Sequence, residues 1–112
     1  MTGVQTCALP ISVFYGHSEA LHIETREKLT AAQARALLRQ APGVAVMDER
    51  RPGGYPTAVT DAAHQDAVFV GRIREDLSHP RGLDLWVVAD NIRKGAALNS
   101  IQVAELLVKS YL

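Results

Sequence analysis

Hydrophobic and polar residues alternate along several stretches of the chain, and this pattern predicts β-strands. The first candidate strand covers residues 13–25 and alternates from His17 onward, and the second covers residues 67–74. A third, at residues 83–89, is apolar on both faces, as expected of a buried central strand. A short run at residues 44–47, rich in β-formers, is a further candidate.

Apolar residues spaced three or four positions apart predict two helices. The first begins with Thr-Ala-Ala-Gln at residues 30–33, a capping box that satisfies free backbone N–H groups, and ends at Ala-Pro-Gly, residues 41–43. The second follows Asp90 or Asn91, either of which can cap its first turn. Two helices and several strands, with strands clustered before the last helix, predict an α+β fold.

Two features of the chain leave alternatives open. Residues 48–66 form a long connector that is dense in turn formers, and such loops usually have a function, although this one could simply wrap its own domain. Arg72 and Arg74 lie on one face of the second strand, where they could serve a dimer interface or be solvated. Composition alone does not choose between these alternatives.

The composition is that of an ordinary globular chain. The 112 residues are 47% hydrophobic and 21% charged, enough for one modest core. Twelve basic and twelve acidic residues cancel, so the basic excess typical of nucleic-acid binders is missing. No apolar run approaches the roughly 20 residues that cross a membrane. We therefore expect neither a nucleic-acid partner nor a membrane.

Cysteine and histidine usage argues against a metal site. The single cysteine, Cys7, excludes an internal disulfide and a cysteine-rich zinc site. His17 and His22 are five residues apart, so an extended strand points them to opposite faces, and no HExxH spacing occurs.

The N-terminus lacks the charged region of a secretory signal, and Pro10 interrupts its apolar stretch. The default expectation is a reducing, cytoplasmic setting.

Residues 1–11 show no period of 2 or 3.6 and no capping pattern. They resemble the in-frame translation of a sequencing-library adapter. We therefore predict that residues 1–12 are an adapter-derived or disordered segment and that residues 13–112 are the protein domain. A lone cysteine in an intracellular chain is a candidate nucleophile, but Cys7 lies in this segment and is not expected to be catalytic.

Three motifs resemble the aspartate-semialdehyde dehydrogenase family: VFYGHSEA at 13–20, VFVGRIRE at 68–75 and LWVVADNIRKGAALN at 85–99. They stand in family-like order and spacing, and the likeness extends from about residue 13 to residue 112. The resemblance implies the C-terminal part of a mixed-sheet catalytic and dimerisation domain. It also implies a missing Rossmann domain for NADP, against which the last helix would pack. The parent enzyme would be a cytoplasmic homodimer or homotetramer.

The resemblance implies reduction of an aspartyl phosphate to the semialdehyde, with release of phosphate, in lysine, threonine and methionine biosynthesis. His17 matches the family's acid–base histidine, which accepts and returns a proton as a cysteine thiohemiacetal forms and collapses. Asn91 matches a position that touches the cofactor near the nicotinamide, where an amide can donate and accept hydrogen bonds. Asn91 also has a competing role as a helix N-cap, and both roles could hold at once.

The departures from the family pattern predict that this chain alone is inactive. The family places a substrate-binding arginine seven residues before the histidine, where this chain has Pro10. The cysteine nucleophile, its neighbouring glutamine, the phosphate-binding basic residues and the glycine-rich nucleotide loop would all lie upstream. Two alternatives remain: a non-catalytic α+β dimerisation or interaction module, and a related acyl-phosphate reductase that acts on a longer acidic substrate.

Overall fold

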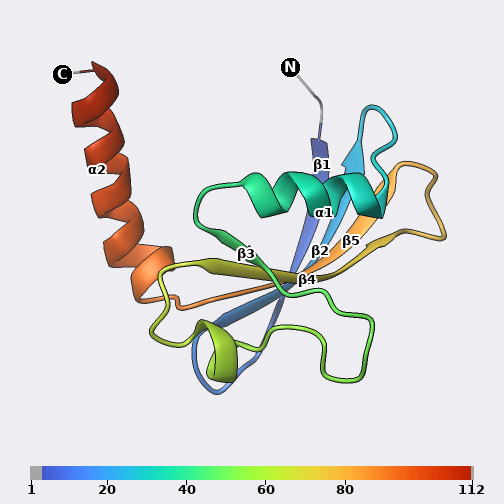
Figure 1. Cartoon of the computed structure of the whole chain (residues 1–112), viewed down its shortest axis with the longest axis horizontal. Coiled ribbons are helices and arrows are strands. Elements are labelled where there is room, and N and C mark those ends of the chain that lie inside the picture. The colour runs from blue at the N-terminus through green and yellow to red at the C-terminus, as the bar shows by residue number, and fades with distance from the viewer. Residues whose placement is uncertain (1–3, 112) are drawn as a thin grey trace.

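One five-stranded sheet, in the order β1-β2-β5-β4-β3, organises the computed structural model, which describes residues 4–111 (Figure 1). The strands are β1 (Val4–Ile11), β2 (His17–Thr25), β3 (Val44–Val46), β4 (Val68–Glu75) and β5 (Gly82–Ala89). Neighbours pair antiparallel except β3, which runs parallel to β4. The predicted mixed α+β fold is confirmed, although the first predicted strand begins at His17 rather than at residue 13.

β1 corrects the expectation that the N-terminal segment lacks regular structure. It pairs with the edge of β2 along its whole length, and Cys7 lies opposite His22. Pairing satisfies backbone groups that β2 would otherwise expose, so a sequence without clear alternation can still form an edge strand. Pro10, which has no N–H, is tolerated because the strand is at the edge. Residues 1–3 lie outside the described residues, and the adapter origin of the segment stays a prediction.

The main core lies between α1 (Ala31–Gln40) and one face of the sheet (Figure 1). The capping box forms as predicted: the Gln33 N–H donates to Thr30 Oγ1 at 3.2 Å, and the Thr30 N–H donates to Gln33 Oε1 at 2.9 Å. The helix buries two small side chains, Ala31 and Ala34, so it packs closely on the strands. Their buried partners in this core are Val70, Ile73, Leu83 and Leu85.

A smaller core covers one end of the opposite face, under the one-turn helix η1 (Ala58–Ala62). Ala58 and Ala62 pack with Val88, and the Trp86 indole donates to the Pro56 carbonyl at 2.9 Å. Gly71 is required beneath this loop, since a Cβ there would lie 2.4 Å from the Met47 carbonyl oxygen. The long connector therefore packs on its own domain through η1 and Pro56.

The sheet face opposite α1 is covered by η1 at one end only. We call the rest of that face the open face. Pairing of β1 with β2 and of β2 with β5 places several side chains there, and they line a shallow depression together with Arg74 of β4. Its central residues are Cys7, Leu9, Ala20, His22 and Asp84. The open face is a mixed surface of small, apolar and charged groups.

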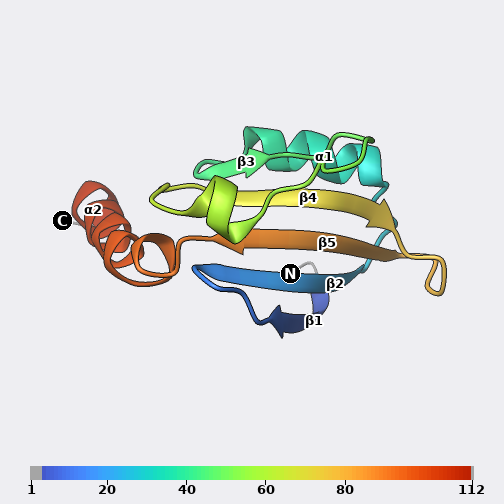
Figure 2. The same ribbon diagram turned by 90° about the horizontal axis from the view of Figure 1, so that it is seen from below.

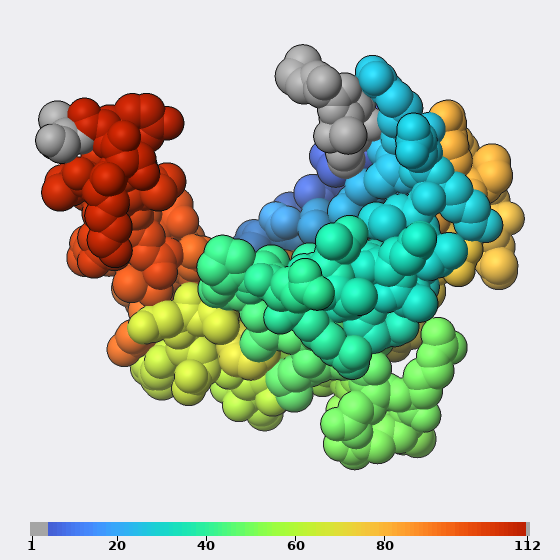
Figure 3. All heavy atoms as spheres, turned by 45° about the horizontal axis from the view of Figure 1, so that its top comes forward, coloured from blue at the N-terminus to red at the C-terminus, as the bar shows by residue number. Residues whose placement is uncertain are grey.

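The predicted last helix is confirmed, with an unusual first turn. η2 (Arg93–Ala97) continues directly into α2 (Leu98–Tyr111). Figures 1 and 2 show α2 standing away from the sheet, and Figure 3 shows the open space between them. None of its described side chains is buried, although Ile101, Leu106 and Val108 are among several large apolar ones. Within residues 4–111, no helix is long and apolar enough to span a membrane.

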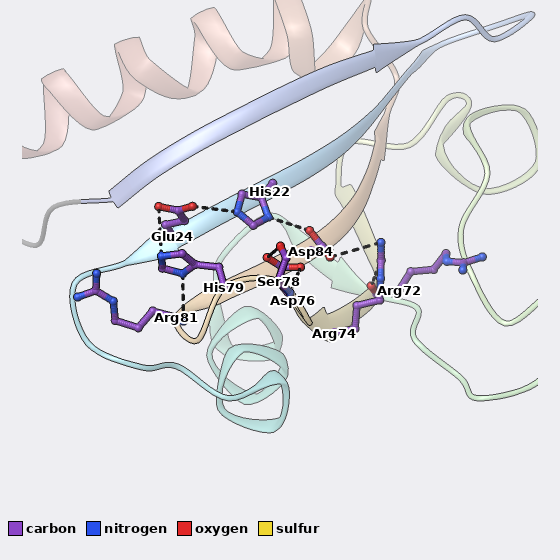
Figure 4. A network of polar contacts seen from close by, with 9 residues as sticks. All are labelled: His22, Glu24, Arg72, Arg74, Asp76, Ser78, His79, Arg81 and Asp84. Carbon is purple, nitrogen blue, oxygen red and sulfur yellow. Dashed lines mark hydrogen bonds and ion pairs between the residues drawn. The ribbon is translucent and has the colours of Figure 1, made fainter.

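Charged side chains of alternating sign cross the open face, and we call them the histidine network (Figure 4). His22 Nδ1 lies 3.0 Å from Asp84 Oδ1, and His22 Nε2 lies 3.4 Å from Glu24 Oε1. The network continues to His79, 3.8 Å from Glu24, and to Arg74, 3.7 Å from Asp84. It joins β2, β4, β5 and the turn between β4 and β5.

The network makes the stability of the fold depend on pH. Hydrogen bonds that the His22 ring donates to Asp84 first and to Glu24 second raise the pKa of His22 above its ordinary value, and the charge of Asp76 adds to this effect against the opposing effect of burial. A histidine whose pKa is raised by folding stabilises the folded state fully below its unfolded pKa. That contribution is lost as the pH rises through the folded pKa.

We expect the free energy of unfolding of the chain to fall as the pH rises through the titration of His22. In His22→Gln this part of the pH dependence should disappear, because the titrating imidazole is gone. Urea unfolding between about pH 5 and pH 9 measures both proteins over the range in which histidines titrate. His64→Asn is the matched control, since asparagine tolerates the left-handed backbone of His64 (φ 63°). Identical pH profiles for the wild type and His22→Gln would contradict this account.

Candidate functional site

His17 is the first residue of β2 and pairs with Ala89, the last residue of β5. It lies two residues before Glu19 and therefore on the same face of the strand, the face that α1 covers further along. Its Nε2 lies 2.8 Å from Glu19 Oε1, and its side chain is 47% exposed. The imidazole is thus held by a carboxylate while it remains accessible to a ligand.

The glycine before His17 has a structural reason. Gly16 adopts a left-handed backbone (φ 79°), which side chains disfavour. A Cβ at this position would lie 2.9 Å from the Ala89 carbonyl oxygen. Only glycine lets the chain turn this close to the end of β5. The Gly-His pair therefore brings the imidazole to the corner of the sheet where the start of β2 meets the end of β5.

Asn91 lies at the same corner, in the turn between β5 and η2. The N-cap position of η2 is Ile92, which has no side-chain cap. Asp90 Oδ1, two residues earlier, accepts the N–H of Ile92 at 2.9 Å and the N–H of Arg93 at 3.1 Å, so Asp90 and not Asn91 satisfies these backbone groups. The Asn91 side chain makes no hydrogen bond within residues 4–111, and the residue is exposed. Its alternative role as a helix cap is therefore not realised.

Asp90 is a buried carboxylate that joins separate parts of the chain. It is 1% exposed, and its Oδ2 accepts the His64 N–H at 2.8 Å and the Tyr15 hydroxyl at 3.2 Å. Hydrogen bonds from the backbone of Arg93 first and His64 second lower the pKa of Asp90, against the opposing effect of burial. Its stabilising contribution is present at neutral pH and is lost as the pH falls through that lowered pKa.

Tyr15 completes the link between Asp90 and the residues before His17. Burial first, and then the charge of Asp90, raise the pKa of the Tyr15 phenol, which therefore stays protonated and donates its hydrogen bond. Its ring also packs against the His64 ring, with the centroids 5.6 Å apart. Sequence reasoning missed this role of Tyr15, and nothing in the sequence pattern around the residue indicates it.

The structure does not bring Cys7 to this corner. Cys7 lies opposite His22, five residues further along β2 than His17. At about 3.3 Å per residue, the position of Cys7 therefore lies roughly 16 Å further along the strand than His17. Cys7 faces the open face, whereas His17 faces the other side. Within residues 4–111, no three histidine, cysteine or acidic side chains come together as metal ligands.

The corner therefore offers an exposed imidazole held by Glu19, a nearby exposed amide at Asn91, and a buried carboxylate that fixes both segments. Such a site can exchange a proton and orient a polar ligand. A nucleophile for covalent chemistry is not among the groups that the described residues place there.

Comparison with known proteins agrees on one family. Residues 2–94 match the family described as semialdehyde dehydrogenase, dimerisation domain. The chain is 57% identical over 109 residues to the aspartate-semialdehyde dehydrogenase of Legionella pneumophila, and this match covers 97% of the chain but 31% of the relative. It is 51% identical over 106 residues to aspartate-semialdehyde dehydrogenase 2 of Vibrio cholerae, covering 95% of the chain and 30% of that relative.

Solved structures give the same result. Aspartate-semialdehyde dehydrogenase II of Vibrio cholerae, in a crystal structure described as complexed with ASA, superposes with a TM-score of 0.80 at 51% identity. That match covers 89% of this chain and 29% of the other. A probable aspartate-semialdehyde dehydrogenase from Pseudomonas aeruginosa gives a TM-score of 0.77 at 40% identity, with the same coverage. The chain thus spans less than a third of the length of these relatives, and it belongs to the semialdehyde dehydrogenase family, within its dimerisation domain.

Proposed function

We propose that this chain is part of an NADP-dependent aspartate-semialdehyde dehydrogenase, to which it contributes the acid–base histidine, His17, and a pairing surface. The observation that carries the proposal is the corner where the start of β2 meets the end of β5. There the pairing of His17 with Ala89 brings the imidazole beside the turn that holds Asn91. The two residues selected by the family resemblance are 74 positions apart in sequence and lie together in the fold.

In this proposal His17 exchanges a proton with the oxygen of a thiohemiacetal. The thiol belongs to a cysteine elsewhere in the longer enzyme. Glu19 binds Nε2 of His17, which leaves Nδ1 to give the proton to the developing alkoxide and to take it back when the thiolate leaves as the aldehyde forms. Position 10 lies opposite Glu19, so it shares the face of His17, and an arginine there could hold a substrate carboxylate.

The residues around Asn91 fit a bound nicotinamide cofactor, which would supply the hydride for the reaction. Asn91 is exposed, and the helix η2 that follows contains three small exposed residues, Gly95, Ala96 and Ala97. A Cβ at Gly95 would approach only the Asn91 side chain, at 3.6 Å, so the helix start is open. Asn91 would bind the cofactor through its amide, and the small side chains would let it approach the backbone.

A chimera tests the catalytic part of the proposal. Residues 13–112 would replace the matching segment of the Legionella pneumophila enzyme, which retains its own upstream residues. We expect His17→Ala to lower kcat about 10²- to 10⁴-fold with little change in KM, because His17 acts in the chemical step. The assay follows the reduction of NADP by aspartate semialdehyde and phosphate.

Arg39→Gln is the control in this chimera, since Arg39 is exposed in the last turn of α1, away from both the corner of His17 and the open face. It should leave kcat unchanged. Full activity in His17→Ala would refute the catalytic assignment. A chimera that prefers the semialdehyde with one additional methylene would instead indicate the related acyl-phosphate reductase.

Pairing through the open face is the second part of the proposal. The chain matches the dimerisation domain of its family. The open face presents Ala20, Trp86 and Leu9 together with the charged residues of the histidine network, and α1 leaves this face uncovered. Two copies that meet face to face would bury these apolar groups and match charges of opposite sign across the interface.

We expect Ala20→Arg to shift the chimera from dimer, or tetramer, toward smaller species, because a guanidinium in the middle of the open face would be buried without a partner. Sedimentation velocity over a range of protein concentrations measures the shift. Leu37→Arg is the matched control, because Leu37 is exposed on α1. Equal assembly of the wild type and Ala20→Arg would exclude the open face as the interface.

A further inference from the structure

A pocket of about 260 Å³ lies between the connector after β3 and the strand β4. Four arginines, two carboxylates and Tyr55 line it. It shares no residue with the corner of His17 and Asn91. The catalytic part of the proposed function therefore leaves this pocket without a role, and of its lining residues only Arg74 belongs to the histidine network.

An irregularity in β4 turns one of these arginines toward the connector. The pairing of β4 with β5 is interrupted by a bulge between Gly71 and Arg74, and inside it Arg72 adopts a left-handed backbone (φ 51°). Bulges redirect side chains, and a strained residue other than glycine is a reason to look for a function. The Arg72 guanidinium lies 5.8 Å from the centre of the Tyr55 ring. Figure 4 shows that it extends away from the histidine network.

The carboxylates of the pocket are already neutralised. Asp48 lies 2.7 Å from the Arg35 guanidinium, and Glu49 pairs with Arg51. In the described part of the chain, neither Arg50 nor Arg72 forms an ion pair. The pocket therefore holds two guanidinium groups whose charge no neighbouring carboxylate balances.

We propose that this pocket binds a small tetrahedral dianion of the phosphate type between Arg72 and Arg50. A guanidinium presents two parallel N–H groups to two oxygens of such an anion, which a lysine cannot do. The Tyr55 ring lies at cation–π distance from the Arg72 guanidinium, a contact that favours this position of the guanidinium before an anion binds. The long connector, whose function the sequence left open, supplies one wall of the site.

Inorganic phosphate is the probe that tests this site in the full 112-residue chain. Backbone amide resonances are followed by NMR during the titration, at constant ionic strength maintained with chloride. We expect saturable shifts centred on Gly54, Tyr55 and Arg72. Arg72→Gln should weaken binding about tenfold, as expected for the loss of a charge-assisted hydrogen-bonding group. Arg72→Lys should restore only part of the affinity, since it keeps the charge and loses the fork.

Arg39→Gln is the control, because Arg39 is an exposed arginine in the last turn of α1. If Arg72→Gln does not fold, Arg50→Gln in the exposed connector replaces it, and the same weakening is expected. Shifts that do not saturate, or equal weakening by Arg39→Gln and by the pocket variant, would overturn the proposal. Acetate, a monoanion, should bind more weakly than phosphate or sulfate. Equal binding of all three would also contradict a dianion site.

Discussion

The carboxylate of Asp90 connects the parts of the chain that form the candidate site. It is buried at the end of β5, and it accepts hydrogen bonds from the loop before His17, from the connector at His64 and from the first turn of the last helix. A buried charge is stable only when its oxygens are satisfied, so these donors and the ionised state of Asp90 depend on one another. The positions of Tyr15, His17 and Asn91 follow from this arrangement.

Hydrogen bonds join the segments at this corner, whereas several large apolar side chains are uncovered elsewhere. α1 and η1 cover the two cores, whereas α2 extends outward with its apolar side chains exposed. Exposed apolar surfaces of this extent mark interaction sites in soluble proteins. The chain carries such surfaces, and it belongs to a dimerisation domain.

The sequence predicted the elements with strong local signals and missed those that depend on distant contacts. The capping box at Thr30, the buried strand β5 and the last helix were predictable because their signals are local. β1 was not, because its strand is formed by pairing with β2 rather than by its own pattern. Family resemblance selected His17 and Asn91, but the link from Tyr15 to Asp90 spans 75 residues and has no local signal.

One measurement tests most directly whether Asp90 holds the corner together. An acid titration of the chain, followed by NMR at the backbone amides of His64, Ile92 and Arg93, reports protonation of the carboxylate that these amides bind. If Asp90 holds the corner together, the three resonances shift together with one midpoint below the ordinary aspartate range, and this transition is missing in Asp90→Asn. Separate midpoints, or a midpoint in the ordinary range, would contradict it.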